Sequence, residues 1–240
     1  MTDADAPALA RLPEDWERAV AVVAHPDDME YGAASAVSRW TSQGKDVRYV
    51  LVTDGEAGIA TMPPERAGPL RRAEQKASCA EVGVETVEFL GHPDGLVVAD
   101  RTLRADLTDV IRRHRPEAVI SINFRDSWGG PSWNHVDHRA VGTALLDAVR
   151  DAANPWLFTD RGDPWAGVQL VAFIASPQST HAVDVTDFLD DGIRSLACHR
   201  TYLDNLSGTT DPDAFLRRAA ADMGLLIGVE YAVTFEVVRP

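Results

Sequence analysis

The chain has 240 residues, of which 45% are hydrophobic and 25% are charged, so it is long enough to bury one sizeable core. Its formal net charge is −14 and its sequence pI is about 4.8. Phosphate backbones and anionic membrane surfaces would be repelled by such a protein. We therefore expect neither nucleic acid nor a membrane as a primary partner.

The first 18 residues are polar and acidic, which is unlike a secretory leader with its basic flank. The apolar runs of the chain are all well short of the ~20 residues that span a bilayer. We expect a soluble, cytoplasmic protein in which residues 1–18 form an N-terminal tail and residues 19–240 form a single domain. Cys79 and Cys198 lie in helix-like stretches, which is typical of buried free thiols rather than of a disulfide.

Hydrophobic patterning predicts strands that alternate with helices. Residues 19–26 are a continuous run of small apolar side chains, typical of a strand buried on both faces of a parallel sheet. Helical periodicity then runs from Met29 to Trp40 and stops at Gly44. Further strands are predicted over 47–55, 86–90, 118–123 and 169–176, and further helices over 71–82, 103–114, 136–152 and 187–203. Residues 228–240 alternate as a half-buried strand does, and we expect them at an edge of the sheet.

This alternation predicts an α/β fold, a Rossmann-like, doubly wound and mostly parallel sheet with helices on both faces. Right-handed crossovers bring the carboxyl ends of parallel strands to one rim, where ligands bind in open α/β sheets. Polar side chains follow the first four predicted strands at this rim. They are His25, Asp27 and Asp28; Asp54 and Glu56; His92 and Asp94; and His135, Asp137 and His138.

The first cluster places an imidazole and two adjacent carboxylates at the start of a helix. Because successive side chains cannot all point the same way, one carboxylate can join His25 on a metal ion while the other faces the substrate as a general base. An isolated aspartate at this position would be explained as a helix cap. The whole segment from His25 to Glu30 is harder to explain in that way.

The segment NHVDH, residues 134–138, places His135 and His138 three positions apart on one face of a predicted helix. Histidines at helix starts are common, so this spacing alone is a weak signal. Two imidazole nitrogens and a carboxylate, with a position left for water, are typical of a catalytic zinc site. Together the two clusters predict one Zn²⁺ per chain, although other divalent metals accept the same ligands.

With these motifs the sequence resembles the PIG-L/LmbE family of zinc N-deacetylases from about residue 19 to residue 203. The resemblance is carried by AHPDDME at 24–30, TDGEAG at 53–58, Arg71-x-x-Glu74, PDG at 93–95 and NHVDH at 134–138. It implies that His25, Asp28 and His138 bind the metal and that Asp27 is the general base. It also implies that His135 stabilises the oxyanion or protonates the leaving amine, with Asp137 orienting its ring.

The resemblance further implies that the substrate is a sugar-like small molecule carrying an N-acetyl or other N-acyl group. Arg71 and Asp94 match positions that contact substrate, the first as a polar anchor and the second as a hydroxyl acceptor. An exposed ion pair with Glu74 explains Arg71 equally well. Trp133 stands where a substrate-facing tyrosine can sit in the family, and an indole supplies no hydroxyl.

Other functions remain open at this point. An amidase of larger acylated or thiol-conjugated glycosides would use the same metal chemistry with a different acyl pocket. The intact Asp27 and the full ligand set oppose a non-catalytic binding domain, and the absence of a G-x-G-x-x-G turn opposes a dinucleotide site. We expect Glu30 and Glu56 to be structural and His199 to lie in the core or beside the site, and the sequence leaves a homo-oligomer open.

Overall fold

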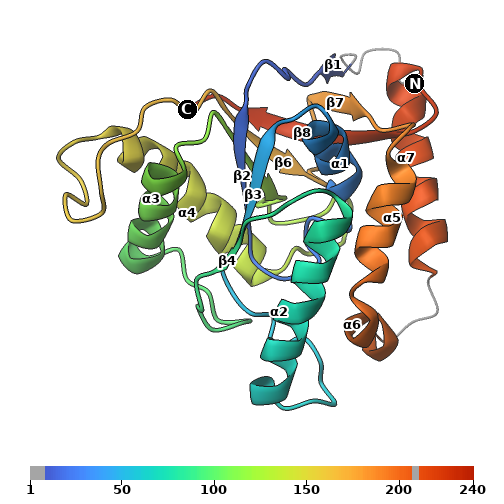
Figure 1. The fold of residues 1–240 in the computed structure, drawn as a ribbon, viewed down its shortest axis with the longest axis horizontal. Helices are drawn as coiled ribbons and strands as arrows, with labels where there is room; N and C mark the ends of the chain where they lie inside the picture. Colours follow the sequence, from blue (N-terminus) through green and yellow to red (C-terminus); the bar gives the residue numbers. More distant parts are fainter. Residues whose placement is uncertain (1–8, 207–210) are drawn as a thin grey trace.

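A computed structural model describes residues 9–206 and 211–240. These residues contain one eight-stranded sheet with the strand order β1-β7-β8-β6-β5-β2-β3-β4 (Figure 1). The strands are β1 (Ala10–Arg11), β2 (Arg18–Val23), β3 (Asp46–Leu51), β4 (Val87–Phe89), β5 (Ala118–Ile122), β6 (Leu170–Ile174), β7 (His181–Asp184) and β8 (Ala232–Val238). Every neighbouring pair is parallel except the two pairs that include β8.

Helices cover both faces of this sheet (Figure 1). They are α1 (Ala34–Ser42), α2 (Pro64–Glu81), α3 (Arg101–His114), α4 (Val136–Ala153), α5 (Leu189–Ala197), α6 (Arg200–Asn205) and α7 (Pro212–Ile227). Helices α3 and α4 pack together on one face, while α5 contacts α1, α2 and α7 on the other side. The predicted α/β class, with a mostly parallel sheet between two helical layers, is confirmed.

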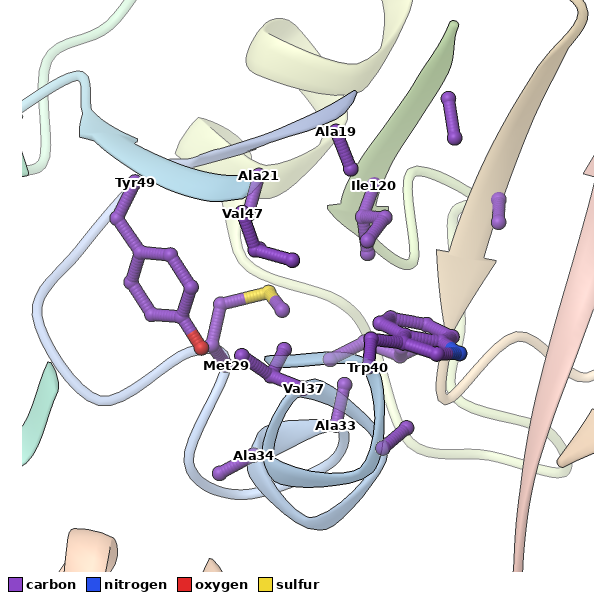
Figure 2. Close-up of a cluster of buried hydrophobic side chains, with 14 of the residues drawn as sticks. Ala19, Ala21, Met29, Ala33, Ala34, Val37, Trp40, Val47, Tyr49 and Ile120 are labelled. Carbon is purple, nitrogen blue, oxygen red and sulfur yellow. The ribbon is translucent and has the colours of Figure 1, made fainter. Parts of the chain in front are cut away.

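Successive residues of β2 belong to two different hydrophobic cores. Ala21 and Val23 face the core beneath α1, and Val20 and Val22 face the core beneath α3 and α4. This division explains why the strand reads as an unbroken apolar run. Figure 2 shows the first core, in which Val37 and Trp40 of α1 pack beside Met29, Tyr49 and the small side chains of β2.

The expectation that the last strand lies at an edge is wrong. Strand β8 lies between β6 and β7 and is antiparallel to both. Strand β7 has four residues and β1 has two, so neither is long enough to show a hydrophobic period. These two short strands continue the sheet beyond β8, which is why Phe235 is completely buried.

Some predicted helices differ from the observed ones, and one observed helix was not expected. The helix expected from residue 29 begins at Ala34, because the carbonyl of Met29 closes a series of turns by accepting from the amides of residues 32–34. The helix expected over 187–203 is divided into α5 and α6 at Cys198 and His199. Helix α7 was not predicted at all.

Part of the expected N-terminal tail contacts the sheet. Ala10 and Arg11 pair with β7, and the indole of Trp16 is buried against Trp40, with ring centroids 5.2 Å apart. Residues 1–8 of that tail lie outside the described residues. Within the described residues, the helices are all too short or too polar to cross a bilayer.

Candidate active site

A cavity of about 420 Å³ opens at the carboxyl ends of the central strands. Its lining comes from the segment after β2, from the start of α4 and from the C-terminal helices. The lining residues are His25, Asp27, Asp28, Tyr31, Gly32, Gly58, Arg71, Asp94, Ile122, Trp128, His135, His138, Ile174, Ala175, Tyr202 and Phe215. The cavity therefore brings together chemical groups that lie far apart in the sequence.

Three ligand atoms converge at the floor of this cavity. His138 Nε2 lies 3.0 Å from Asp28 Oδ1 and 3.2 Å from His25 Nδ1, and the latter lies 3.6 Å from Asp28 Oδ1. The side chains of all three residues are largely buried. The structure thus places together the three residues expected to bind the metal, and His135 also lies within 4.8 Å of the two imidazoles.

The opposite nitrogen of each imidazole is held by an oxygen. His25 Nε2 lies 3.2 Å from Asp94 Oδ1 and 3.2 Å from Asp137 Oδ2. His138 Nδ1 lies 3.0 Å from Asn134 Oδ1. If both rings are neutral and carry their hydrogens on these outer nitrogens, the inner nitrogens have free lone pairs available to a metal ion.

Buried charges on the floor compensate one another. Burial alone would lower the pKa of His25, but the charge of Asp28 and hydrogen bonds with Asp137, Asp28 and Asp94 raise it well above its ordinary value. Burial would likewise raise the pKa of Asp28, and the neighbouring His138 and His25 reverse that effect and lower the pKa. Asp28 is therefore an ionised carboxylate at neutral pH.

Asp27 occupies a different environment from Asp28. Its backbone has a φ of 88°, in the left-handed region that residues with a side chain rarely adopt. Its Oδ1 lies 3.2 Å from an Arg71 nitrogen, while its Oδ2 is buried without a hydrogen-bond partner among the described residues. Burial raises the pKa of Asp27 to about 8, and the charge of Arg71 opposes this rise. A carboxylate with a free oxygen and a raised pKa is suited to accepting a proton.

The expectation that Asp137 orients His135 is not what the structure shows. The Asp137 carboxylate accepts hydrogen bonds from the amides of Gly95, at 2.7 Å, and Val97, at 3.1 Å, and contacts His25. His135 is the N-cap of α4, and its Nδ1 accepts from the backbone amide of Asp137 at 3.2 Å. The aspartate contacts the other histidine because its side chain points back across the helix start toward the loop after β4.

His135 nevertheless faces the cavity. Its ring centroid lies 4.8 Å from that of His25 and 5.4 Å from that of His138. Burial and the positive charges of these two histidines lower the pKa of His135 below its ordinary value. The chain thus has a titratable imidazole beside the three converging atoms.

Arg71 and Asp94 both line the cavity. Arg71 is 1% exposed, pairs with Asp27 instead of Glu74, and lies over the ring of Tyr202 at 4.0 Å. The neighbouring Arg72 is half-exposed and contacts Asp54. Asp94 holds His25 through one oxygen and accepts from the amide of Ala57 through the other.

The structure corrects the expected position of the tryptophan. Trp133 is 67% exposed and does not line the cavity, and its ring lies beside Arg139. Trp128 lines the cavity instead, with its ring edge-on to His138 at 5.6 Å between centroids. Both residues belong to the irregular loop before α4, whose path its sequence does not specify.

The two acidic residues expected to be structural accept hydrogen bonds from the protein. Glu30 Oε1 accepts from Gln75 at 2.8 Å and Ser78 at 2.7 Å, and Glu56 accepts from the amide of Asp94 at 2.9 Å. His199 is completely buried, with its Nε2 3.8 Å from Glu30 Oε2.

Sequence reasoning missed several residues around the cavity, namely Asn134, Gln75, Tyr31, Trp128, Tyr202 and Phe215. The motif NHVDH could have indicated a role for Asn134, because its side-chain amide lies next to two histidines and can hydrogen-bond to one of the rings. The aromatic residues lie outside the motifs, although Tyr31 follows AHPDDME directly, so only tertiary packing identifies them.

Comparisons with known proteins identify the family of the chain. The model of the PIG-L family, described as GlcNAc-PI de-N-acetylase, matches residues 20–149. The chain is 30% identical to the diacetylchitobiose deacetylase of Thermococcus kodakarensis over 228 residues, covering 91% of this chain and 82% of that protein. It is also 30% identical to a 1D-myo-inositol 2-acetamido-2-deoxy-alpha-D-glucopyranoside deacetylase of Saccharopolyspora erythraea, covering 66% of this chain and 65% of the relative.

A solved structure shows the same architecture. The N,N'-diacetylchitobiose deacetylase of Pyrococcus horikoshii superposes with a TM-score of 0.83 at 25% identity, covering 94% of this chain and 85% of that one. The predicted enzyme class, an N-deacetylase, is confirmed by these relatives. The chain therefore belongs to the PIG-L family, as the motifs from His25 to His138 indicated.

Proposed function

We propose that this protein uses a zinc ion to remove an acetyl group from the amide nitrogen of an amino sugar or a similar small glycoside. One observation carries the proposal. Three ligand atoms of His25, Asp28 and His138 converge on the cavity floor, and Asp27 lines the same cavity. Named relatives that act on N-acetylated sugars support the substrate class.

The donor set fits zinc. Two imidazole nitrogens and one carboxylate oxygen are common ligands of catalytic zinc, and here His25, Asp28 and His138 would hold the ion. The outer nitrogens of both histidines are bonded to Asp94, Asp137 and Asn134 as second partners of metal-binding histidines usually are. When bound, zinc supplies a Lewis acid that polarises the amide carbonyl and makes water more acidic.

Asp27 then acts as the general base. Its carboxylate accepts a proton from the attacking water, and its buried position favours the protonated form that results. Arg71 holds the other oxygen, so the carboxylate cannot rotate freely between catalytic cycles.

His135 acts on the far side of the reacting amide. Its ring faces the cavity and donates a hydrogen bond to the oxyanion as the neutral imidazole, or a proton to the departing amine nitrogen as the imidazolium. Without such a proton the amine would have to leave as an anion. The Asp137 carboxylate contributes indirectly, because it orients His25.

The rest of the cavity binds the substrate. Apolar side chains of Ile122, Trp128 and Ile174 suit the acetyl methyl group, and the rings of Tyr31 and Phe215 suit an apolar face of a sugar. Asp94 retains lone pairs on both oxygens that can accept a sugar hydroxyl. Arg71 also lines the cavity and adds a polar contact.

The experiment is a panel assay on purified protein of known metal content. About one zinc ion per chain is expected, and free amine should appear from at least one of N-acetylglucosamine, diacetylchitobiose and an N-acetylglucosaminyl inositol. Asp27→Asn should keep the metal and lower kcat by about 10²–10⁴-fold. A zinc-loaded protein that releases no amine from any of these compounds would contradict the proposal and favour an amidase of larger glycosides or a non-catalytic binding domain.

A further inference from the structure

The conformation of Asp27 needs support from outside its own turn. With a φ of 88°, its backbone is in a region that glycine tolerates and that aspartate adopts only at a cost. Glycine cannot replace it, because the carboxyl group is the proposed base. Something else must hold the backbone where the side chain can reach the substrate.

The contact that holds it is made by Gln75 on α2. The backbone N–H of Asp27 donates to Gln75 Oε1 at 3.0 Å, and the glutamine side chain is completely buried. This contact joins the turn after β2 to a helix 48 positions further along the chain. The N–H of Asp27 would be a buried donor without a partner if the glutamine were removed.

The orientation of the Gln75 amide is fixed by a second buried group. Gln75 Nε2 donates to Glu30 Oε1 at 2.8 Å and to Cys79 Sγ at 3.4 Å. A reversed amide would place its NH₂ against the N–H of Asp27 and its oxygen against the Glu30 carboxylate. Both of these contacts would be repulsive, so the network permits only the observed orientation.

We propose that Gln75, oriented by Glu30, is a positioning residue that holds the backbone of Asp27 in its left-handed conformation and thereby aims the carboxylate at the substrate. The proposal rests on the role of Asp27 as general base. It assigns a catalytic consequence to a glutamine that makes no contact with the substrate or the metal ligands.

Gln75→Met tests the proposal, because methionine keeps the volume and loses the acceptor. We expect kcat to fall by about tenfold to a hundredfold, since a displacement of the order of 1 Å at a catalytic group has such effects. KM should stay within about threefold and the zinc content should be unchanged. A crystal structure of this variant should show Asp27 outside the left-handed region.

Ser195→Ala is the matched control. Ser195 is completely buried between α5 and α2 and bonds to Ser78, so its removal weakens the packing of α2 against α5 without removing a hydrogen bond of Gln75 or Asp27. It should lower Tm while kcat stays within about threefold of wild type. A folded Gln75→Met enzyme with kcat in that same range would overturn the proposal.

Glu30→Gln provides the second variant if Gln75→Met does not fold. An amide at position 30 can present an NH₂ to Gln75 Nε2, so one of the two contacts that fix the orientation of the Gln75 amide is weakened, while the Asp27 N–H remains. We expect kcat to fall by about fivefold or more, and an unchanged kcat would overturn the proposal. If the wild-type enzyme releases no amine at all, the proposed function fails, whereas the position of Asp27 in crystals of the variant still tests the inference.

Discussion

The floor of the cavity and its aromatic wall, which includes Tyr31, Tyr202 and Phe215, differ in burial and in polar contacts. On the floor, the side chains of His25, Asp28 and His138 are largely buried, and each has a polar partner within 3.2 Å. On the wall, Phe215 is 45% exposed, and its nearest aromatic neighbour is Tyr31, with centroids 6.1 Å apart. Polar contacts thus fix the side chains of the floor, as a catalytic site requires, whereas the exposed wall is less constrained.

This difference assigns distinct kinetic effects to the two regions. Floor residues should alter metal content or kcat, because they touch the reacting atoms. Wall residues should alter KM, because they contact parts of the substrate that do not react. Variants of each region test this assignment, and the largest effect is expected at the proposed metal ligands.

His138→Ala should abolish both zinc binding and activity. The change removes one of three ligand atoms and leaves Asp28 Oδ1 without the imidazole nitrogen that lies 3.0 Å from it. Zinc content should drop far below one ion per chain, and the loss of activity should exceed that of any other single change. Elemental analysis and the amine-release assay measure the two effects. A variant that keeps its zinc would show that His138 is not a ligand.

His135→Ala should keep the metal and lower kcat and kcat/KM by similar factors of about a hundredfold or more. The residue lies beside the ligands, and its assigned hydrogen bond strengthens only in the transition state. Steady-state kinetics on a cleaved N-acetyl sugar provide the measurement. If the variant remained within about threefold of wild type, a difference well under 1 kcal/mol, His135 would have no part in the reaction.

Asp137→Asn tests whether Asp137 acts through His25 or through His135. The carboxylate contacts His25 and not the ring of His135. Its loss should therefore weaken zinc binding by about 10–100-fold, as loss of a partner of a ligating histidine does. Titration with a competing chelator measures this change. Normal zinc affinity with a reduced kcat would instead indicate that Asp137 acts through His135.

The sequence predicted the floor better than the wall because the floor depends on short segments with local geometry. His25 to Asp28 follow directly after a buried strand, and His135 to His138 begin a helix, so their approximate positions follow from the topology alone. The partner of Asp137 was mistaken, because two histidines lay within reach and sequence spacing does not distinguish them.

The wall could not be predicted because its residues come from segments whose positions depend on tertiary packing. Helix α7 lacks a motif, and β8 was expected at an edge although the short strand β7 lies beyond it. Tyr202 lines the cavity because the predicted helix over 187–203 breaks at His199. Such breaks are decided by buried contacts that a single sequence does not reveal.

The smallest effect is expected for Phe215→Ala at the wall. Loss of one aromatic face should raise KM by about threefold to tenfold, which corresponds to the roughly 0.5–1.5 kcal/mol of an aromatic contact. The zinc content and kcat should stay near their wild-type values, because Phe215 lines the cavity without contacting a ligand atom.

Leu225→Ala on the same helix controls for damage to α7. Leu225 is 81% exposed and does not line the cavity, so its truncation should leave KM unchanged. The comparison is sharpest with substrates of two sizes. If Phe215 contacts a part of the glycoside remote from the acetyl group, KM should rise more for diacetylchitobiose than for N-acetylglucosamine, since only the larger compound extends past the reacting sugar. An equal fall in kcat for both compounds would instead place Phe215 with the floor residues, and the division of the cavity into two regions would be wrong.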